Sequence, residues 1–350
     1  MPITIYDIAR EAKVGIGTVS RVFNNNPNVT SETRKKVLAV SKRLDYVPHA
    51  YAQGLARKRT NTLAAIIPFV TNYFFIEVLK GVQDKCAALG YDLILYGINH
   101  PSEVAQYLNK SIQRGRVDGI LYFSMKLPVD FEKKYQDMRK PIVLVDSYDE
   151  MCDSLFVENL EAAKIATRHL ISLGHKNIGL IDGNMNSIPA RQRLEGFKVA
   201  MQESGLEIKE EYIVISTATR LDGFSRDAGY LAMKELMARG ASLPTAAVIS
   251  SDVQSIGAIS ALREKGLKVP EDIAIVSFDD IELAVHFGLT TMRQPMYEMG
   301  ELAVAKLVQR CETPDAPPSH QTFTPRLVIR TSCGMNKPET YIENFLHSEN

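Results

Sequence analysis

The sequence predicts a small all-helical N-terminal domain, followed by an α/β core of two doubly wound parallel-sheet lobes. The first 46 residues hold three short amphipathic helical patterns separated by turn signals. From Thr60 onward, short β-branched runs alternate with amphipathic helical patterns, as in parallel sheets with helices on both faces. The alternating part is about 270 residues long, more than one sheet usually takes, so we expect two similar lobes.

The three helical patterns of the first domain have recognisable ends. Thr4, with Asp7 three residues later, resembles a capping box at the start of the first helix. A second helix opens near Ile16 after a glycine break and ends before Pro27, which cannot continue it. A third begins after Thr30 or Ser31, and its expected inner stripe is Val37, Leu38, Ser41 and Leu44. Two helices joined by a tight turn, with a third closing the core, predict a helix-turn-helix over residues 1–46.

The segment 47–60 is predicted to be a linker. It is rich in alanine and basic residues but has too few apolar side chains for a core of its own. Isolated helices this short are marginal in water, so we expect it to become ordered only against a partner.

The core alternates strand and helix patterns. The expected strands are 63–67, 91–96, 119–123, 142–145, 178–181, 247–250 and 273–278. The expected helices between them are 75–89, 161–173, 190–203, 225–239 and 253–265. The segment 336–350 is polar and predicted to be a tail.

The charge distribution separates the head from the body. The chain has 41 basic and 41 acidic residues, yet residues 1–60 hold 11 lysines and arginines against four acids. A head of net charge +7 on a body of −7 indicates that the head meets a polyanion. No long apolar run or signal peptide is visible, so we expect a cytoplasmic protein.

Sequence motifs argue against catalysis. There is no P-loop, no strand-linked G-x-G-x-x-G, no G-x-S-x-G and no H-E-x-x-H. The four cysteines are scattered without metal-ligand spacing. We therefore predict no enzyme activity, no catalytic residues, no metal and no cofactor.

Five motifs in order carry a family resemblance. They are Thr4-Ile5-Tyr6-Asp7-Ile8-Ala9-Arg10-Glu11-Ala12, Thr18-Val19-Ser20-Arg21-Val22, Asn28-Val29, Thr33-Arg34 and Leu44-x-Tyr46-x-Pro48. With these motifs the chain resembles the lactose/galactose repressor (LacI/GalR) family of bacterial transcription regulators. Its head is most similar to that of catabolite control proteins. The resemblance implies a homodimer on a palindromic operator and a periplasmic-binding-protein-like core. It also implies an N-lobe of about 61–160 plus 293–323 and a C-lobe of about 161–292 plus 324–335.

The resemblance also implies a set of DNA contacts. The second helix would enter the major groove, with Ile16, Gly17 and Thr18 nearest the bases. In the hinge, Leu55 would wedge into a base step of the minor groove. The complete expected set is Thr4, Tyr6, Ile16, Gly17, Thr18, Ser20, Arg21, Asn24, Asn28, Thr30, Thr33, Tyr46, His49, Ala52, Gln53, Leu55 and Ala56.

A small-molecule effector, a sugar or a related compound, is expected between the lobes at the carboxyl ends of the strands. Arg191 would donate a fork of hydrogen bonds, and Asp279 would accept from hydroxyl groups. Asp146 and Asp252 are either further acceptors or helix caps, and the three phenylalanines are either stacking faces or core. The complete expected set is Phe69, Asn72, Phe74, Ser124, Asp146, Arg191, Phe224, Ser251, Asp252 and Asp279. Glu158 stands where many relatives have aspartate, which favours a role at a lobe crossover.

A second reading makes the corepressor a phosphorylated phosphocarrier protein rather than a small molecule. Gln294-Pro295-Met296-Tyr297, with Gly300, is similar to the segment that catabolite regulators present to that partner. However, Ala305 stands where those regulators usually have a basic residue. The sequence therefore favours the small-molecule reading.

Overall fold

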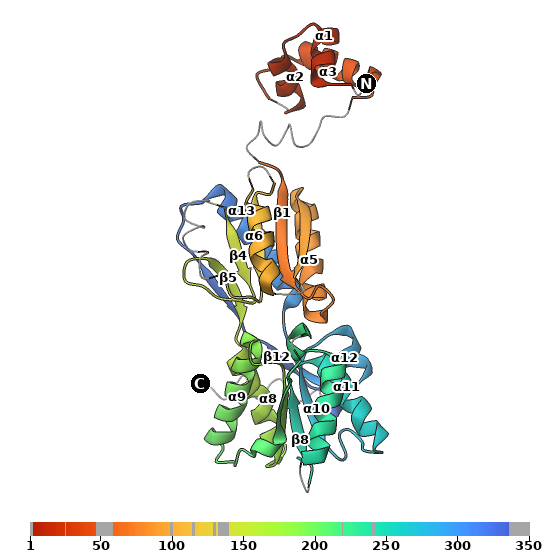
Figure 1. Ribbon diagram of the computed structural model, residues 1–350, viewed down its shortest axis with the longest axis vertical. Coiled ribbons are helices and arrows are strands. Elements are labelled where there is room, and N and C mark those ends of the chain that lie inside the picture. The colour runs from red at the N-terminus through yellow and green to blue at the C-terminus, as the bar shows by residue number, and fades with distance from the viewer. Residues whose placement is uncertain are drawn as a thin grey trace.

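The computed structural model describes residues 3–24, 26–46, 59–98, 101–113, 116–128, 131, 140–218, 220–239 and 242–335. The predicted hinge, except for Arg59 and Thr60, and the polar tail lie outside these residues. Within them the chain forms a helical head and two α/β lobes (Figure 1). The predicted fold class is confirmed.

The head contains α1 (Ile5–Ala12), α2 (Ile16–Phe23) and α3 (Ser31–Arg43). The backbone N–H and the hydroxyl of Thr4 both donate to Asp7 Oδ2, at 3.0 and 2.7 Å. The Thr30 hydroxyl accepts from the Thr33 N–H at 3.3 Å, so Thr30 caps α3 as predicted. The head has its own apolar core, made by Ile8, Ala9, Ala12, Val19, Val22 and Val37.

The prediction that Leu38 lies on the inner stripe of α3 is wrong. Leu38 is 47% exposed, whereas Val37 and Ser41 are buried. Successive helical residues are about 100° apart, so the face that buries Val37 and Ser41 turns Leu38 outward.

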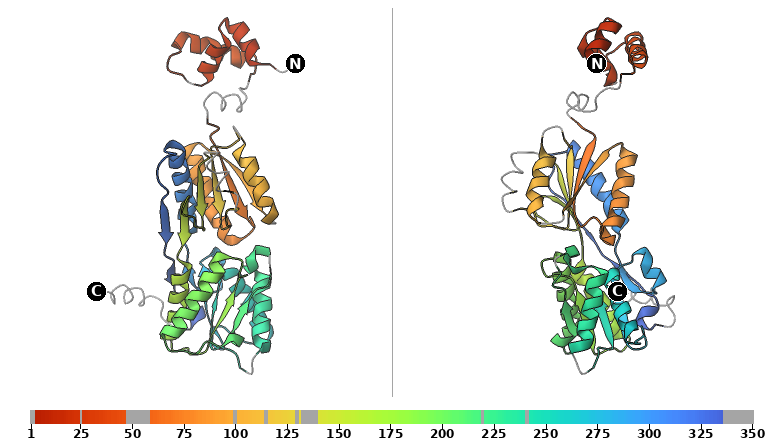
Figure 2. Two further views of the ribbon diagram at one scale, coloured as in Figure 1. Left: turned by 60° about the vertical axis from the view of Figure 1, so that its left-hand side comes forward. Right: turned by 45° about the vertical axis from the view of Figure 1, so that its right-hand side comes forward.

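The first lobe is built on a six-stranded parallel sheet in the order β11-β5-β4-β3-β1-β2. Its strands are β1 (Thr62–Pro68), β2 (Asp92–Ile98), β3 (Gly119–Phe123), β4 (Ile142–Val145), β5 (Asp153–Val157) and β11 (His320–Phe323). Leu63, Ala65 and Ile67 of β1 pack under α5 (Tyr73–Leu89) and α13 (Met296–Glu312). The alternate residues Ala64 and Ile66 pack under α6 (Val104–Ile112) on the other face. Figure 2 shows helices on both faces of this sheet.

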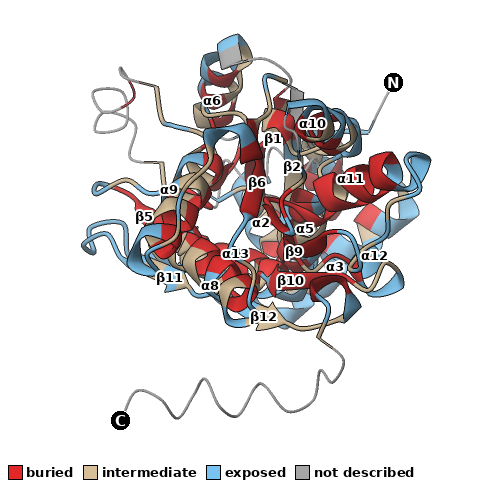
Figure 3. Ribbon diagram, turned by 90° about the horizontal axis from the view of Figure 1, so that it is seen from below, coloured by how far each residue is buried: buried red, intermediate tan, exposed pale blue. Residues whose placement is uncertain are grey.

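The second lobe repeats the architecture in the strand order β12-β10-β9-β8-β6-β7, with only β12 antiparallel. Its strands are β6 (Ile178–Asp182), β7 (Ile213–Ile215), β8 (Ala246–Ile249), β9 (Ala274–Asp279), β10 (Thr290–Arg293) and β12 (Arg326–Val328). Helices α8 (Asn159–Ser172) and α9 (Ile188–Glu203) cover one face. Helices α10 (Arg226–Arg239), α11 (Asp252–Glu264) and α12 (Glu282–His286) cover the other. Seen from below, the strands β6, β9 and β10 are buried within this cover (Figure 3).

The chain passes between the lobes three times, after β5, after β10 and between β11 and β12. Glu158 lies at the first passage, where its N–H donates to Phe323 O at 3.0 Å and its carboxylate accepts from the Thr324 hydroxyl. Glu158 therefore ties the first passage to the third, the crossover role that the sequence favoured. Among the described residues, none of the helices combines the length and the apolar character that crossing a membrane requires.

Candidate functional site

The head presents the expected DNA contacts on the outer sides of its helices. Tyr6 is 66% exposed and Ile16 is 42% exposed, so both side chains are accessible to a partner. Nothing lies within 4 Å of a Cβ placed on Gly15 or Gly17, so the start of α2 is open. An exposed helix N-terminus with apolar and hydroxyl side chains suits entry into a DNA groove.

Other expected contacts are held in place by local bonds. Arg21 Nε donates to Gly17 O at 3.1 Å, which lays the guanidinium along the start of α2. Ser20 and Asn24 are joined by a hydrogen bond of 3.4 Å, and Tyr46 packs on Phe23 with ring centroids 5.8 Å apart. Thr4, Asn28 and Thr30 are exposed, and Thr18 and Thr33 are half-buried. The hinge contacts His49, Ala52, Gln53, Leu55 and Ala56 lie outside the described residues.

Between the two lobes lies a cavity of about 50 Å³ lined from both sides. The first lobe contributes Phe69, Asn72, Phe74, Phe75, Ser124 and Asp146; the second contributes Ser187, Pro189, Arg193, Asp222, Phe224, Ser251, Val253, Asp279 and the crossover residue Gln294. Phe69 follows β1, Ser124 follows β3, Asp146 follows β4 and Asp279 ends β9. The cavity therefore sits at the carboxyl ends of both parallel sheets, where such folds bind ligands.

Backbone strain is concentrated at this cavity. Nine non-glycine residues of the described chain have positive φ, and five of them line the cavity: Phe69, Ser124, Asp146, Asp222 and Asp279, with φ from 44° to 108°. Such conformations cost about 1–3 kcal/mol each and collect at functional sites. Four of the five, Phe69, Ser124, Asp146 and Asp279, lie at the ends of strands, and Asp222 lies in a short turn.

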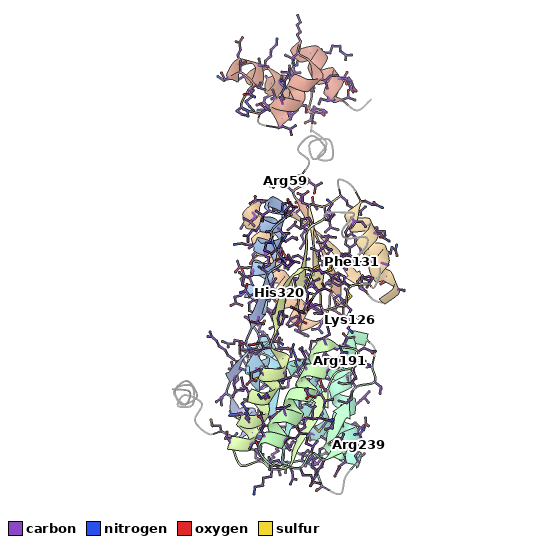
Figure 4. The ribbon with its side chains drawn as sticks, turned by 90° about the vertical axis from the view of Figure 1, so that its left-hand side faces the viewer. Arg59, Lys126, Phe131, Arg191, Arg239 and His320 are labelled. Atoms are coloured by element: carbon purple, nitrogen blue, oxygen red, sulfur yellow. The ribbon has the colours of Figure 1, made fainter. Side chains whose placement is uncertain are left out.

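The arginine at the centre of the cavity is Arg193, not the predicted Arg191. Arg193 is 5% exposed, its Nε donates to Asn159 Oδ1 at 3.0 Å, and its Nη1 donates to Ser250 O. Its guanidinium lies 4.5 Å from the ring centroid of Phe278 and 5.7 Å from that of Phe224. Arg191 is exposed at the edge of the second lobe that faces the first (Figure 4), and its Nη1 donates to Met185 O at 2.5 Å.

The helical periodicity of α9 distinguishes Arg193 from Arg191. The buried face of α9 includes Ala190, Arg193, Phe197 and Ala200, and Arg193 occupies its three-residue spacing while Arg191 does not. A buried arginine on an apolar helix face requires polar partners, and here it finds them at the cavity.

Asp252 belongs to the framework, not the cavity lining. It is fully buried, with Oδ2 accepting from the Ile281 N–H at 2.9 Å and Oδ1 accepting from the Thr291 hydroxyl at 2.8 Å. Both carboxylate oxygens are therefore occupied by bonds within the second lobe, and Asp252 acts neither as a lining acceptor nor as the cap of α11. Its neighbour Ser251 caps α11 by accepting from the Gln254 N–H at 3.2 Å, and also lines the cavity.

Of the cavity carboxylates, Asp146 and Asp279 are buried and Asp222 is half-buried, and burial disfavours their charged forms. Burial raises the pKa of Asp146 to about 6, against a hydrogen bond of 2.6 Å from the Ser124 hydroxyl and the charge of Arg193. Burial also raises the pKa of Asp279, whose Oδ1 accepts from Gln294 Nε2 at 2.6 Å. Burial raises the pKa of Asp222 as well. Three carboxyl groups and one arginine thus offer mainly acceptors to a ligand.

Of the predicted effector contacts, eight line the cavity and two, Arg191 and Asp252, do not. Four polar lining residues were not predicted from the sequence: Ser187, Arg193, Asp222 and Gln294. Asp222 lies in a short turn and Gln294 in a lobe crossover, so no periodic pattern marks either one.

A helix-turn-helix head joined to a two-lobed core with a cleft at its strand ends defines a DNA-binding transcription regulator. Residues 4–49 match the model of the bacterial regulatory proteins of the lacI family, and residues 167–333 match a periplasmic binding protein-like domain. The chain belongs to the LacI family of transcriptional repressors.

Individual relatives agree with this assignment. The chain is 35% identical to catabolite control protein A of Priestia megaterium over 314 residues, covering 88% of this chain and 92% of the relative. It is 32% identical to a ribose operon repressor of Haemophilus influenzae over 335 residues, covering 94% and 98%. The solved structure of a CelR–cellobiose complex is similar with a TM-score of 0.70 and 27% identity, covering 94% of this chain and 99% of that one.

Proposed function

We propose that the protein is a dimeric repressor of carbohydrate genes that binds a palindromic operator, and that a sugar bound in the cleft controls its affinity for that operator. One observation carries the effector class: the cavity combines carboxylates, Arg193 and four phenylalanine rings, and both lobes contribute to it. Carboxylates accept from sugar hydroxyl groups, and aromatic rings cover the apolar faces of sugar rings. The excess of carboxylates disfavours an anionic ligand at the same position.

An exposed apolar strip supports the homodimer. Tyr73 and Ile76 of α5 and Leu95 of the edge strand β2 are between 37% and 42% exposed. Leu231 of α10 is 63% exposed and Val285 of α12 is 60% exposed. Figure 1 shows α5 and α12 on the same side of the two lobes. Large apolar side chains exposed on elements of both lobes favour a protein interface.

The alternative partner, a phosphorylated carrier protein, is less well supported. Tyr297 of α13 is 37% exposed, and its hydroxyl donates to Asp84 at 2.8 Å. The hydrogen bond to Asp84 raises the pKa of Tyr297 most; burial and the negative charges of Asp84, Glu301 and Glu298 raise it further. A face with three acidic side chains repels a phosphoryl group. Because the chain is similar to a catabolite control protein, the experiment also tests the phosphorylated carrier protein as a corepressor.

The test begins by recovering the operator from genomic fragments retained by the full-length protein. A labelled duplex carrying it is then titrated with protein in the presence of a sugar panel. We expect one sugar to change operator affinity at least ten-fold, in line with usual allosteric couplings of about 1–3 kcal/mol. If no sugar does so, and the phosphorylated carrier protein strengthens binding instead, the effector assignment is wrong.

A further inference from the structure

A second, larger chamber opens outward from the effector cavity. It has a volume of about 470 Å³ and shares Phe69, Ser124, Ser187 and Asp222 with the inner cavity. The inner cavity, at about 50 Å³, holds only a few water molecules. The outer chamber falls within the range of about 300–1,000 Å³ that is usual for small-molecule sites. A ligand reaching the polar inner residues therefore has most of its room outside them.

The walls of the outer chamber differ chemically from those of the inner cavity. Aliphatic side chains predominate: Pro68, Ile98, Val104, Ala105, Met125, Pro128 and Ile188. The other residues that belong only to this chamber are Ser102, Lys126 and Asn186. Lys126 lies at the end of the first lobe that faces the second (Figure 4). A second sugar ring would find few acceptors here for its hydroxyl groups, whereas an apolar group would be removed from water.

The two lobes close the chamber from opposite sides. The start of α6 and the segment after β3 form one wall, and the residues that open α9 form the other. Ser187, which precedes α9, is 7% exposed and lines both spaces. Its hydroxyl makes no capping bond to the start of α9. Because Ser187 lines both spaces, it marks the junction where the polar end of a ligand would meet its apolar end.

We propose that the natural effector is a glycoside with an apolar aglycone. Its sugar ring binds where the two spaces join, within reach of the polar groups of the inner cavity, and its aglycone packs on the aliphatic wall of the outer chamber. This inference rests on the proposed sugar effector and narrows its chemical class. The ligand contacts both lobes over both compartments, so it favours the closed arrangement of the lobes more than a free sugar does.

The test uses full-length protein and matched methyl and phenyl glycosides of common hexoses and pentoses, with disaccharides as a further set. Isothermal titration measures each affinity. We expect the phenyl form of the recognised sugar to bind at least about ten-fold more tightly than its methyl form, the gain for burying much of one ring.

Two variants test whether the tighter binding of the phenyl glycoside arises in the outer chamber. Ala105→Trp fills the chamber from an exposed position of α6, where folding is not at risk, and should bring the phenyl-to-methyl ratio close to one. Gln106→Trp places the same side chain on the neighbouring exposed residue, which does not line the chamber, and should leave the ratio unchanged.

The outcomes separate the two claims. Equal binding of methyl and phenyl glycosides, or a disaccharide that binds as tightly as the phenyl form, overturns the aglycone chamber but not the sugar effector. A phenyl preference that survives Ala105→Trp also overturns it. If no member of the panel binds, the proposed function fails, and the inference fails with it.

Discussion

Arg193 lies where several buried groups of the cleft meet. Its guanidinium contacts Asn159, the carbonyl of Ser250 and the ring of Phe278, and its charge opposes the raised pKa values of Asp146 and Asp279. No other cation lines the cavity among the residues that the structure describes. The effector response should therefore depend on this one side chain.

We expect Arg193→Ala to weaken effector binding by about ten- to 100-fold, the usual effect of losing hydrogen bonds from a charged donor. Operator binding without effector should persist, because the head does not touch this residue. Titration calorimetry and gel shift measure the two affinities. Arg191→Ala is the matched control, one helical position away from the buried face, and should bind effector normally. Equal losses in both variants would contradict the assignment of the cavity.

Asp146 makes stability depend on pH. Its pKa is raised from 3.8 to about 6 by burial, so the folded chain keeps a proton that the unfolded chain has already lost. The stabilisation is complete below about pH 4 and is lost as the pH rises through 6. In the natural protein, the ionisation of Asp146 should lower the free energy of unfolding by up to about 3 kcal/mol between pH 4 and 7. Asp146→Asn should remove this decrease. Urea unfolding at several pH values measures this. An unchanged pH profile would show that Asp146 is not buried as described.

At the scale of elements, close helix packing depends on glycines. A Cβ added to Gly81 of α5 would lie 2.0 Å from the backbone carbonyl oxygen of Tyr297 in α13. Gly300 of α13 is matched in the same way to the carbonyl oxygen of Val78. The two helices therefore approach backbone to backbone on one face of the first sheet.

Gly81→Ala should force these helices apart and cost about 1–3 kcal/mol, as overpacking usually does. Thermal unfolding would show a melting temperature lower by several degrees. Gln83→Ala, on the exposed side of the same helix, is the control and should leave it unchanged. If Gly81→Ala melts like the natural protein, the described contact between the helices is wrong.

Elements with strong periodicity were predictable, and short edge elements were not. Strands such as β3 and β4 appear at the predicted bounds because they are continuous apolar runs buried on both faces. Five strands were not predicted: β5, β7, β10, β11 and β12. Each is only three to five residues long, and all but β7 mix polar with apolar residues, so no continuous apolar run marks them. In the cleft, Asp146 and Asp279 were predictable because each follows an apolar run. Gln294 was not, because only the return of the chain between the lobes brings it to the ligand.

At the scale of the molecule, we expect the basic head to bind DNA and the acidic body to bind the effector. Removing residues 1–60 should abolish retention of genomic fragments and leave effector affinity within about two-fold, because the cavity is built without those residues. Filter retention and calorimetry on full-length and shortened chains check this. Equal DNA retention by both forms would contradict the assignment of the head.

The apolar strip predicts the oligomeric state. Leu231→Glu places a charge on the exposed part of α10 and should shift the protein from dimer to monomer at micromolar concentration. Sedimentation velocity measures the shift. Lys209→Glu, on the loop before β7, changes charge away from the strip and serves as the control. A Leu231→Glu protein that remains a dimer would place the interface elsewhere.

The interrupted path of the first lobe has a consequence for synthesis. Five of the six strands of its sheet lie within residues 62–157, but Met299, Ala303, Val304 and Leu307 of α13, which cover one face, lie more than 140 residues later. On the ribosome, that face stays uncovered until almost the whole chain has emerged, while segment 159–293 can already assemble five of the six strands of the second sheet with the helices that cover them. The nascent protein should therefore complete its second lobe first, and should need protection from aggregation for most of its time in translation.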